Sequence, residues 1–78
     1  MRHCSWRWET SERYYVLALQ QDLFGTWILV KVWGGKDNKK SGMKTEAFDD
    51  AFAIDAEIAA VFKKRKRRGY VLIKNSPE

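Results

Sequence analysis

Six consecutive basic residues, Lys63-Lys64-Arg65-Lys66-Arg67-Arg68, carry the most distinctive chemistry in the sequence. Lysine and arginine side chains bind phosphate oxygens, and blocks of like charge often contact nucleic acid. The alternative is a solvated helix end, because cations are stabilised near a helix C-terminus by the helix dipole. Six in a row exceed what a helix terminus needs, so the run favours contact with nucleic acid.

A second basic stretch, residues 36–42, contains no apolar side chain and therefore predicts a basic surface loop. Lys36, Lys39 and Lys40 would extend the basic patch if this loop lies on the same side of the protein as the run. The chain has 15 Lys and Arg against 10 Asp and Glu, a formal net charge of +5. This balance favours polyanionic partners, although it also simply favours solubility.

Trp33 follows a strongly apolar segment and precedes two glycines. An exposed indole here would stack on a base or a sugar, as aromatic side chains do in many nucleic-acid-binding proteins. The alternative is a tryptophan packed into the core of a sheet. The residues around Trp33 leave both interpretations open.

Other kinds of chemistry have little support in the sequence. The single cysteine, Cys4, cannot form an internal disulfide, and with His3 as the one histidine there is no credible zinc ligand set. No Gly-rich loop followed by Lys-Ser/Thr is present to hold a phosphate. The acidic residues near position 50 fit a helix start better than a catalytic carboxylate pair. We therefore expect no enzyme activity, no metal and no cofactor.

The element around which the chain is organised is predicted at residues 22–35. Trp27, Ile28, Val30, Val32 and Trp33 are aromatic or β-branched, which suits a strand, and glycines mark both ends. Both faces of this segment are mostly apolar. The pattern predicts a central strand that is covered on both sides.

Three further segments are predicted as strands and one as a helix. Residues 5–9, 13–20 and 43–48 have strand character, and hairpin spacing predicts antiparallel pairing between 13–20 and the central strand. A helix is predicted near Asp49–Lys66, with Asp49 as its N-cap and Gly69 as its C-terminal stop. Its apolar stripe consists of Ala51, Ile54, Ile58, Val61 and Phe62, flanked by Phe52 and Ala59.

The predicted fold class is α+β: a four- to five-stranded antiparallel sheet with one long helix packed across one face. Residues 1–78 fit a single domain with a core at about 5–70 and a frayed tail at 75–78, and residues 70–74 either add a short strand or pack across the sheet. The N-terminus lacks the apolar core of a signal peptide, and no apolar run is long enough to span a membrane. We expect a soluble, reduced, cytoplasmic protein.

Several motifs together resemble the WGR domain, in particular its small stand-alone bacterial members. They are Tyr14-Tyr15-Val16-Leu17, Asp22-Leu23-Phe24-Gly25, a strand ending in Trp33-Gly34, and a helix ending in a basic run and Arg68-Gly69-Tyr70. The family is named after a Trp-Gly-Arg signature, and here Gly35 stands at the arginine position.

The resemblance implies an antiparallel sheet with one helix and a non-catalytic module. In DNA-break-dependent poly(ADP-ribose) polymerases the WGR domain contacts DNA ends, and the signature tryptophan, here Trp33, takes part in that contact. Two hypotheses follow. The chain is a nucleic-acid-binding module, with DNA as its partner, which binds phosphates through the basic helix end; or it is a protein-interaction or regulatory module, including one that self-associates.

Overall fold

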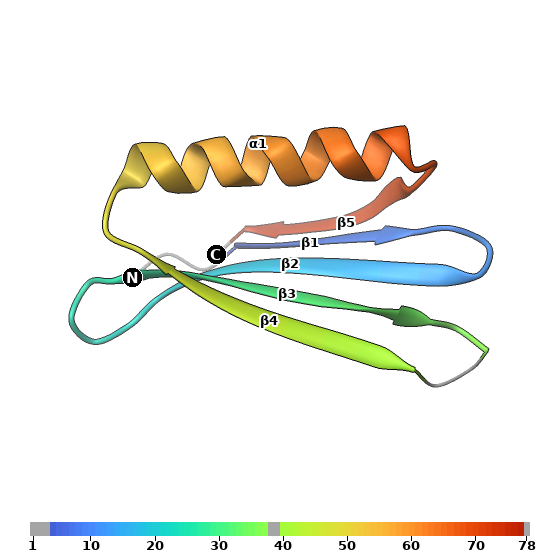
Figure 1. The fold of residues 1–78 in the computed structure, drawn as a ribbon, viewed down its shortest axis with the longest axis horizontal. Coiled ribbons are helices and arrows are strands. Elements are labelled where there is room, and N and C mark those ends of the chain that lie inside the picture. The colour runs from blue at the N-terminus through green and yellow to red at the C-terminus, as the bar shows by residue number, and fades with distance from the viewer. Residues whose placement is uncertain (1–3, 38–39, 78) are drawn as a thin grey trace.

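The computed structural model describes residues 4–37 and 40–77. In these residues five strands and one helix follow one another along the chain: β1 (Cys4–Glu9), β2 (Arg13–Gln21), β3 (Trp27–Gly35), β4 (Ser41–Phe48), α1 (Ala51–Arg67) and β5 (Val71–Pro77). The strands form one sheet in the order β4-β3-β2-β1-β5, and every neighbouring pair is antiparallel. Figure 1 shows α1 lying along one face of this sheet. The predicted α+β fold is confirmed.

The helix connects the two edge strands of the sheet. β4 leads into α1 at one edge, α1 crosses the face, and β5 then pairs with β1 at the other edge (Figure 1). β5 extends to Pro77, which pairs with Cys4. The prediction of a frayed tail is therefore wrong for residues 75–77, because backbone pairing with β1 fixes them; Glu78 lies outside the described residues.

The core lies between α1 and the sheet. Leu17 on β2 and Leu29 on β3 are fully buried, and Val61 of the helix packs with them. Phe62 meets the edges of Trp6 and Trp8, with ring centroids 5.7 and 5.0 Å apart. Large aromatic side chains bury much area per residue, which allows a short chain to build this core.

The prediction that β3 is covered on both sides is wrong. β3 is an interior strand, but α1 covers one face of the sheet, and no element of the described chain covers the other (Figure 1). Ile28, Val30 and Val32 alternate with the buried Leu29 and therefore lie on the uncovered face, where they are partly exposed. Apolar side chains on a partly solvated face gave the same sequence pattern as a fully buried strand.

Both ends of α1 are capped by local hydrogen bonds. The N-cap is Asp50, whose Oδ1 accepts the Phe52 N–H at 2.9 Å, rather than Asp49 as predicted. At the other end Gly69 has a φ of 81°, and the N–H groups of Gly69 and Tyr70 bond to the carbonyls of Lys66 and Arg65. These bonds form a Schellman motif, which needs a left-handed residue at the glycine position. The predicted stop at Gly69 is confirmed.

The face of α1 that packs on the sheet yields a stability prediction. Ile54 is buried and Phe52 is 84% exposed, although both were placed on or beside the predicted apolar stripe. We expect Ile54→Ala to lower the free energy of unfolding by about 2–5 kcal/mol. The matched control Phe52→Ala should change it by less than about 0.5 kcal/mol. Denaturant unfolding would measure both, and equal losses would show that the helix buries a different face.

Candidate nucleic-acid interface

An open cleft lies at the end of the sheet where α1 finishes. Three connections line it: the β1–β2 turn, the segment from the end of β3 to the start of β4, and the turn from α1 into β5. Successive elements alternate in direction, so these connections meet at one end although they are distant in sequence (Figure 1). The cationic side chains of the cleft are those of Arg13, Lys40, Arg65 and Arg68.

A row of aromatic side chains crosses the sheet and ends in this cleft. Trp8, Tyr15 and Trp33 are register partners on β1, β2 and β3, and Gly42 continues the row on β4. Trp8 and Tyr15 are buried, whereas Trp33 is 41% exposed. The Tyr15 and Trp33 rings are nearly parallel, at 16°, with centroids 6.4 Å apart. The row therefore runs from the core to a partly exposed indole.

Gly42 makes room for that indole. A Cβ atom at position 42 would lie 2.5 Å from Cε2 of Trp33, much closer than atoms can approach. A larger residue there would push the ring away from β4. The orientation of Trp33 is thus fixed by Tyr15 on one neighbouring strand and by the bare backbone of Gly42 on the other.

Arg65 lies beneath the surface of the cleft. Its side chain is 9% exposed, and its guanidinium lies 4.1 Å from the ring centre of Tyr15 and 4.8 Å from that of Tyr70. Within the described residues, its buried Nε has no hydrogen-bond partner. Arginine over aromatic faces is a favourable cation–π arrangement. Arg65 therefore does not fit the solvated helix end that the sequence left open as the alternative for the basic run.

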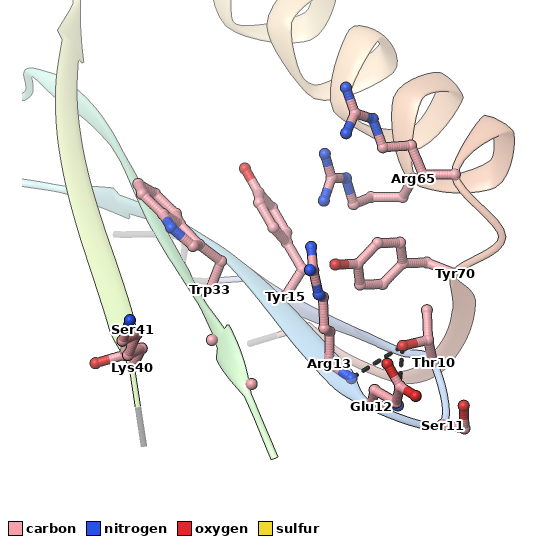
Figure 2. A pocket seen from close by; sticks show the side chains of 13 residues that line it. Thr10, Ser11, Glu12, Arg13, Tyr15, Trp33, Lys40, Ser41, Arg65 and Tyr70 are labelled. Atoms are coloured by element: carbon pink, nitrogen blue, oxygen red, sulfur yellow. Dashed lines mark hydrogen bonds between the residues drawn. The ribbon is translucent and has the colours of Figure 1, made fainter. Parts of the chain in front are cut away.

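Arg13 projects from the opposite wall of the cleft. The Thr10 hydroxyl accepts the N–H groups of Glu12 and Arg13 at 3.2 and 2.9 Å, and these two bonds shape the β1–β2 turn (Figure 2). Figure 2 shows the Arg13 side chain between Tyr15 and Tyr70. Its register partner is Gly35, and this pair lies two positions from the pair Tyr15 and Trp33. Arg13 is thus the next residue of β2 beyond the aromatic row on the same face of the sheet.

Comparison with known proteins identifies the family. A protein-family model described as the WGR domain matches residues 5–77. The chain belongs to the WGR domain family. A search of curated proteins and a search of solved structures found no significant match. The WGR domain is a module associated with nucleic-acid binding in poly(ADP-ribose) polymerases, and no enzyme family was matched.

The basic residues predicted for this WGR domain do not form one patch. Lys40 lines the cleft, and Lys39 lies outside the described residues. Lys36 does not line the cleft; its Nζ bonds to Glu9 Oε1 at 2.7 Å. Glu9 alternates with the buried Trp8, so this ion pair lies on the uncovered face of the sheet. The condition under which Lys36 would extend the helix patch is not met, because its ion pair with Glu9 lies on the face of the sheet away from α1.

The helix directs the side chains of the run Lys63–Arg68 to different sides. Arg65 and Arg68 face the cleft, and Lys64 lies beside Arg65 over β3. Lys63 and Lys66 lie on the other flank, next to β5. Arg67 is exposed and lines neither flank. Six consecutive residues cover more than one helical turn of 3.6 residues, so they must point in several directions.

Arg13, Tyr15 and Tyr70 are among the cleft residues that sequence reasoning did not select as site residues. The sequence did contain one signal, since Arg13 has the same parity as Tyr15 and Leu17 and must share their face. The position of Arg13 opposite Gly35 depends on strand register, which the residue pattern does not specify. Tyr70 follows Gly69, where the helix ends, and the sequence did not indicate which residues Tyr70 contacts.

A charged network next to the aromatic row ties three elements together. Nζ of Lys31 on β3 lies 2.7 Å from Glu46 Oε1 on β4 and 2.5 Å from Glu57 Oε2 on α1. Burial lowers the pKa of Lys31, but the hydrogen bonds that Lys31 donates to Glu46 and Glu57 outweigh this effect and raise the pKa above its ordinary value. The bond from Lys31 lowers the pKa of Glu46. Burial has the opposite effect on Tyr15: it raises the pKa of this side chain, and the hydroxyl stays neutral.

Searches for other kinds of site gave negative results. In residues 4–37 and 40–77, no group of three or more His, Cys, Asp or Glu side chains is arranged to hold a metal ion. The helix in that part of the chain is also too short and too polar to cross a membrane.

The packing of Arg65 predicts that the residues of the basic run contribute unequally to the free energy of unfolding. Arg65→Ala removes both cation–π contacts and should lower the free energy of unfolding by about 1–3 kcal/mol. Arg67→Ala, two residues away and exposed, should change it by less than about 0.5 kcal/mol. Thermal melts of the two variants test this, and a neutral Arg65→Ala would contradict the observed packing.

The Lys31 network predicts a loss of stability in acid. A carboxylate whose pKa is lowered on folding stabilises the protein above its ordinary pKa of 4.5, and this contribution is lost as the pH falls through the folded-state value. The melting temperature should therefore fall between pH 5 and the lower pKa of Glu46. Glu46→Gln should be less stable at pH 7 and should show a weaker dependence on pH in this window. An unchanged pH dependence would exclude Glu46 as a contributor.

Proposed function

We propose that this WGR domain is a non-catalytic nucleic-acid-binding module, that its partner is DNA, and that the cleft is the binding site. The observation that carries the proposal is the partly exposed indole of Trp33 in a cleft with three arginines and Lys40. Aromatic faces and cations together form the usual surface for single strands and strand ends. Membership of the WGR family supports the same partner.

Trp33 would act as a stacking surface. Tyr15 and Gly42 hold the indole in one orientation before any ligand arrives, so little conformational freedom would be lost on binding. Stacking of an aromatic side chain on a base contributes about 1–3 kcal/mol. A sugar ring at a strand end would use the same exposed face.

Arg13 would supply the guanidinium that the signature position lacks. Gly35 occupies that position and has no side chain, but Arg13 is its register partner on β2 and projects into the same cleft. A guanidinium can bind a phosphate through two parallel hydrogen bonds, which a lysine cannot do. Arg68 would contact a second phosphate from the helix side, and Arg65 would add positive charge from below.

Most of the affinity would come from phosphates, and sequence preference would be weak. Hydrogen bonds to phosphate carry no sequence information. The flank residues Lys63, Lys64, Lys66 and Arg67 would add long-range attraction rather than specific contacts. The protein-interaction hypothesis is favoured by a different observation, the exposed side chains of Leu23 and Phe24 at the far end of the sheet.

The proposal predicts different salt dependences for two variants. Arg13→Gln combined with Arg68→Gln should weaken DNA binding and make the plot of log affinity against log salt shallower by about 0.9 per lost phosphate contact on duplex. Trp33→Ala should weaken binding by about 1–3 kcal/mol with an unchanged salt slope. Titrations of blunt, overhanging and nicked duplexes, single-stranded DNA and RNA at several salt concentrations would measure both effects and identify the preferred partner.

Lys74→Gln provides a matched control, because Lys74 is exposed on β5 and does not line the cleft. It also removes one charge, so it separates a local contact from a general change in net charge. If the arginine double variant binds DNA with the parent's affinity and slope, the cleft is not the binding site. Thermal melts of each variant would exclude unfolding as the cause of any loss.

A further inference from the structure

Two large apolar side chains project into solvent at the end of the sheet opposite the cleft. Leu23 is 91% exposed and Phe24 is 92% exposed, and both lie in the turn between β2 and β3. We call residues 22–25 the apolar turn. Adjacent side chains of this size that touch almost nothing in their own chain suggest a contact with another surface.

Hydrogen bonds hold the apolar turn in one conformation. Oδ1 of Asp22 accepts the N–H groups of Phe24 at 2.8 Å and Thr26 at 2.9 Å. The Asp22 N–H bonds to the Thr26 carbonyl, and the Gly25 N–H bonds to the Asp22 carbonyl. Gly25 has a φ of 82°, which glycine adopts without strain. Leu23 and Phe24 are therefore exposed on an ordered turn. Binding of a partner would cost little conformational entropy, because the turn already has one conformation.

Three aspartates lie in the apolar turn and in the connection beside it. Trp27 and Phe48 are register partners, so the β2–β3 turn and the β4–α1 connection leave the sheet side by side. Asp22 lies in the first of these connections, and Asp49 and Asp50 lie in the second. A matching surface on a partner would be apolar with positive charge around it.

The same chain carries such a surface beside the second half of α1. A pocket of about 480 Å³ lies between α1 and the β1–β5 edge, and its apolar lining consists of Trp8, Ala59, Phe62, Tyr70 and Leu72. We call it the side pocket. Lys63 and Lys66 complete its lining, and both are exposed. Its volume is within the range of about 300–1,000 Å³ that is usual for pockets that bind small ligands, so it has room for a phenylalanine side chain.

We propose that the apolar turn of one copy of this chain docks into the side pocket of a second copy. Apolar side chains meet an apolar pocket, and the aspartates beside the turn meet Lys63 and Lys66. The side pocket is lined by the second half of α1 and by Trp8 and Leu72, near the ends of β1 and β5 that face the cleft. The apolar turn leaves the opposite end of β2 and β3, and neither Leu23 nor Phe24 lines the pocket of its own chain. The contact is head-to-tail, and such contacts form open chains of molecules unless the rotation closes a ring.

Self-association of this kind leaves the cleft accessible. The cleft and the side pocket share one lining residue, Tyr70, and the two lie on different flanks of α1. Leu23 and Phe24 are far from both along the chain and line neither. Copies joined head-to-tail would therefore each retain the residues of the cleft.

Complementation between two variants tests the proposal. The turn variant, Leu23→Ser with Phe24→Ser, changes side chains that are almost fully exposed, and the pocket variant, Lys63→Glu with Lys66→Glu, reverses two exposed charges. Each variant alone should self-associate at least about tenfold more weakly than the parent, because it lacks one half of the contact. A mixture should form a complex of two chains and stop there, since the turn variant still has an intact pocket and the pocket variant an intact turn.

Sedimentation velocity over a range of protein concentrations would measure these species. The parent should form progressively larger species as the concentration rises, and Met43→Ser, which changes an exposed apolar residue on β4, should behave like the parent. The proposal is overturned if the parent stays monomeric, if the turn variant associates like the parent, or if the mixture forms no two-chain complex. Circular dichroism of each variant would show that it is folded.

Discussion

Burial of one sheet face under a single helix is the constraint on which the rest of the described structure depends. A chain of 78 residues buries a smaller share of its surface than a larger protein does, so it has to build its core at one interface. Leu17 and Leu29 fill its centre, and Phe62 meets Trp6 and Trp8 beside them. Because α1 connects the two edge strands, its packing also brings β5 against β1 and so completes the sheet.

The alternation of strand direction divides the connections between two ends. The β1–β2 turn, the β3–β4 connection and the end of α1 meet at one end, where they bring Arg13, Lys40 and Arg68 together. The β2–β3 turn and the β4–α1 connection meet at the other end, with the exposed Leu23 and Phe24 and three aspartates. One small sheet thus separates the proposed binding cleft from the apolar turn.

The aromatic row links the core to the proposed binding surface. Tyr15 packs in the core and also supports Trp33 and Arg65, so the position of the exposed indole depends on the same packing that stabilises the fold. The Lys31 network fixes β3, β4 and α1 to one another directly beside this row. Tyr15, Trp33 and Arg65 therefore lie on strands and on the helix, whereas turns supply other residues of the cleft. Rigid support of these three side chains favours binding because less freedom is lost.

The sequence by itself determined four of the strands, the helix and their order, and it left β5 open. The change from a period of two to a period of 3.6 located α1, Gly69 marked its end, and hairpin spacing predicted the pairing of β2 with β3. These features are local, since they depend on residues that are neighbours along the chain. Tertiary structure decided which basic residues share a surface. Helical rotation buried Arg65 and separated Lys63 from Lys64, and strand register put Arg13 opposite Gly35. Register and helix orientation depend on contacts between distant segments, and a pattern of residue types does not specify those contacts.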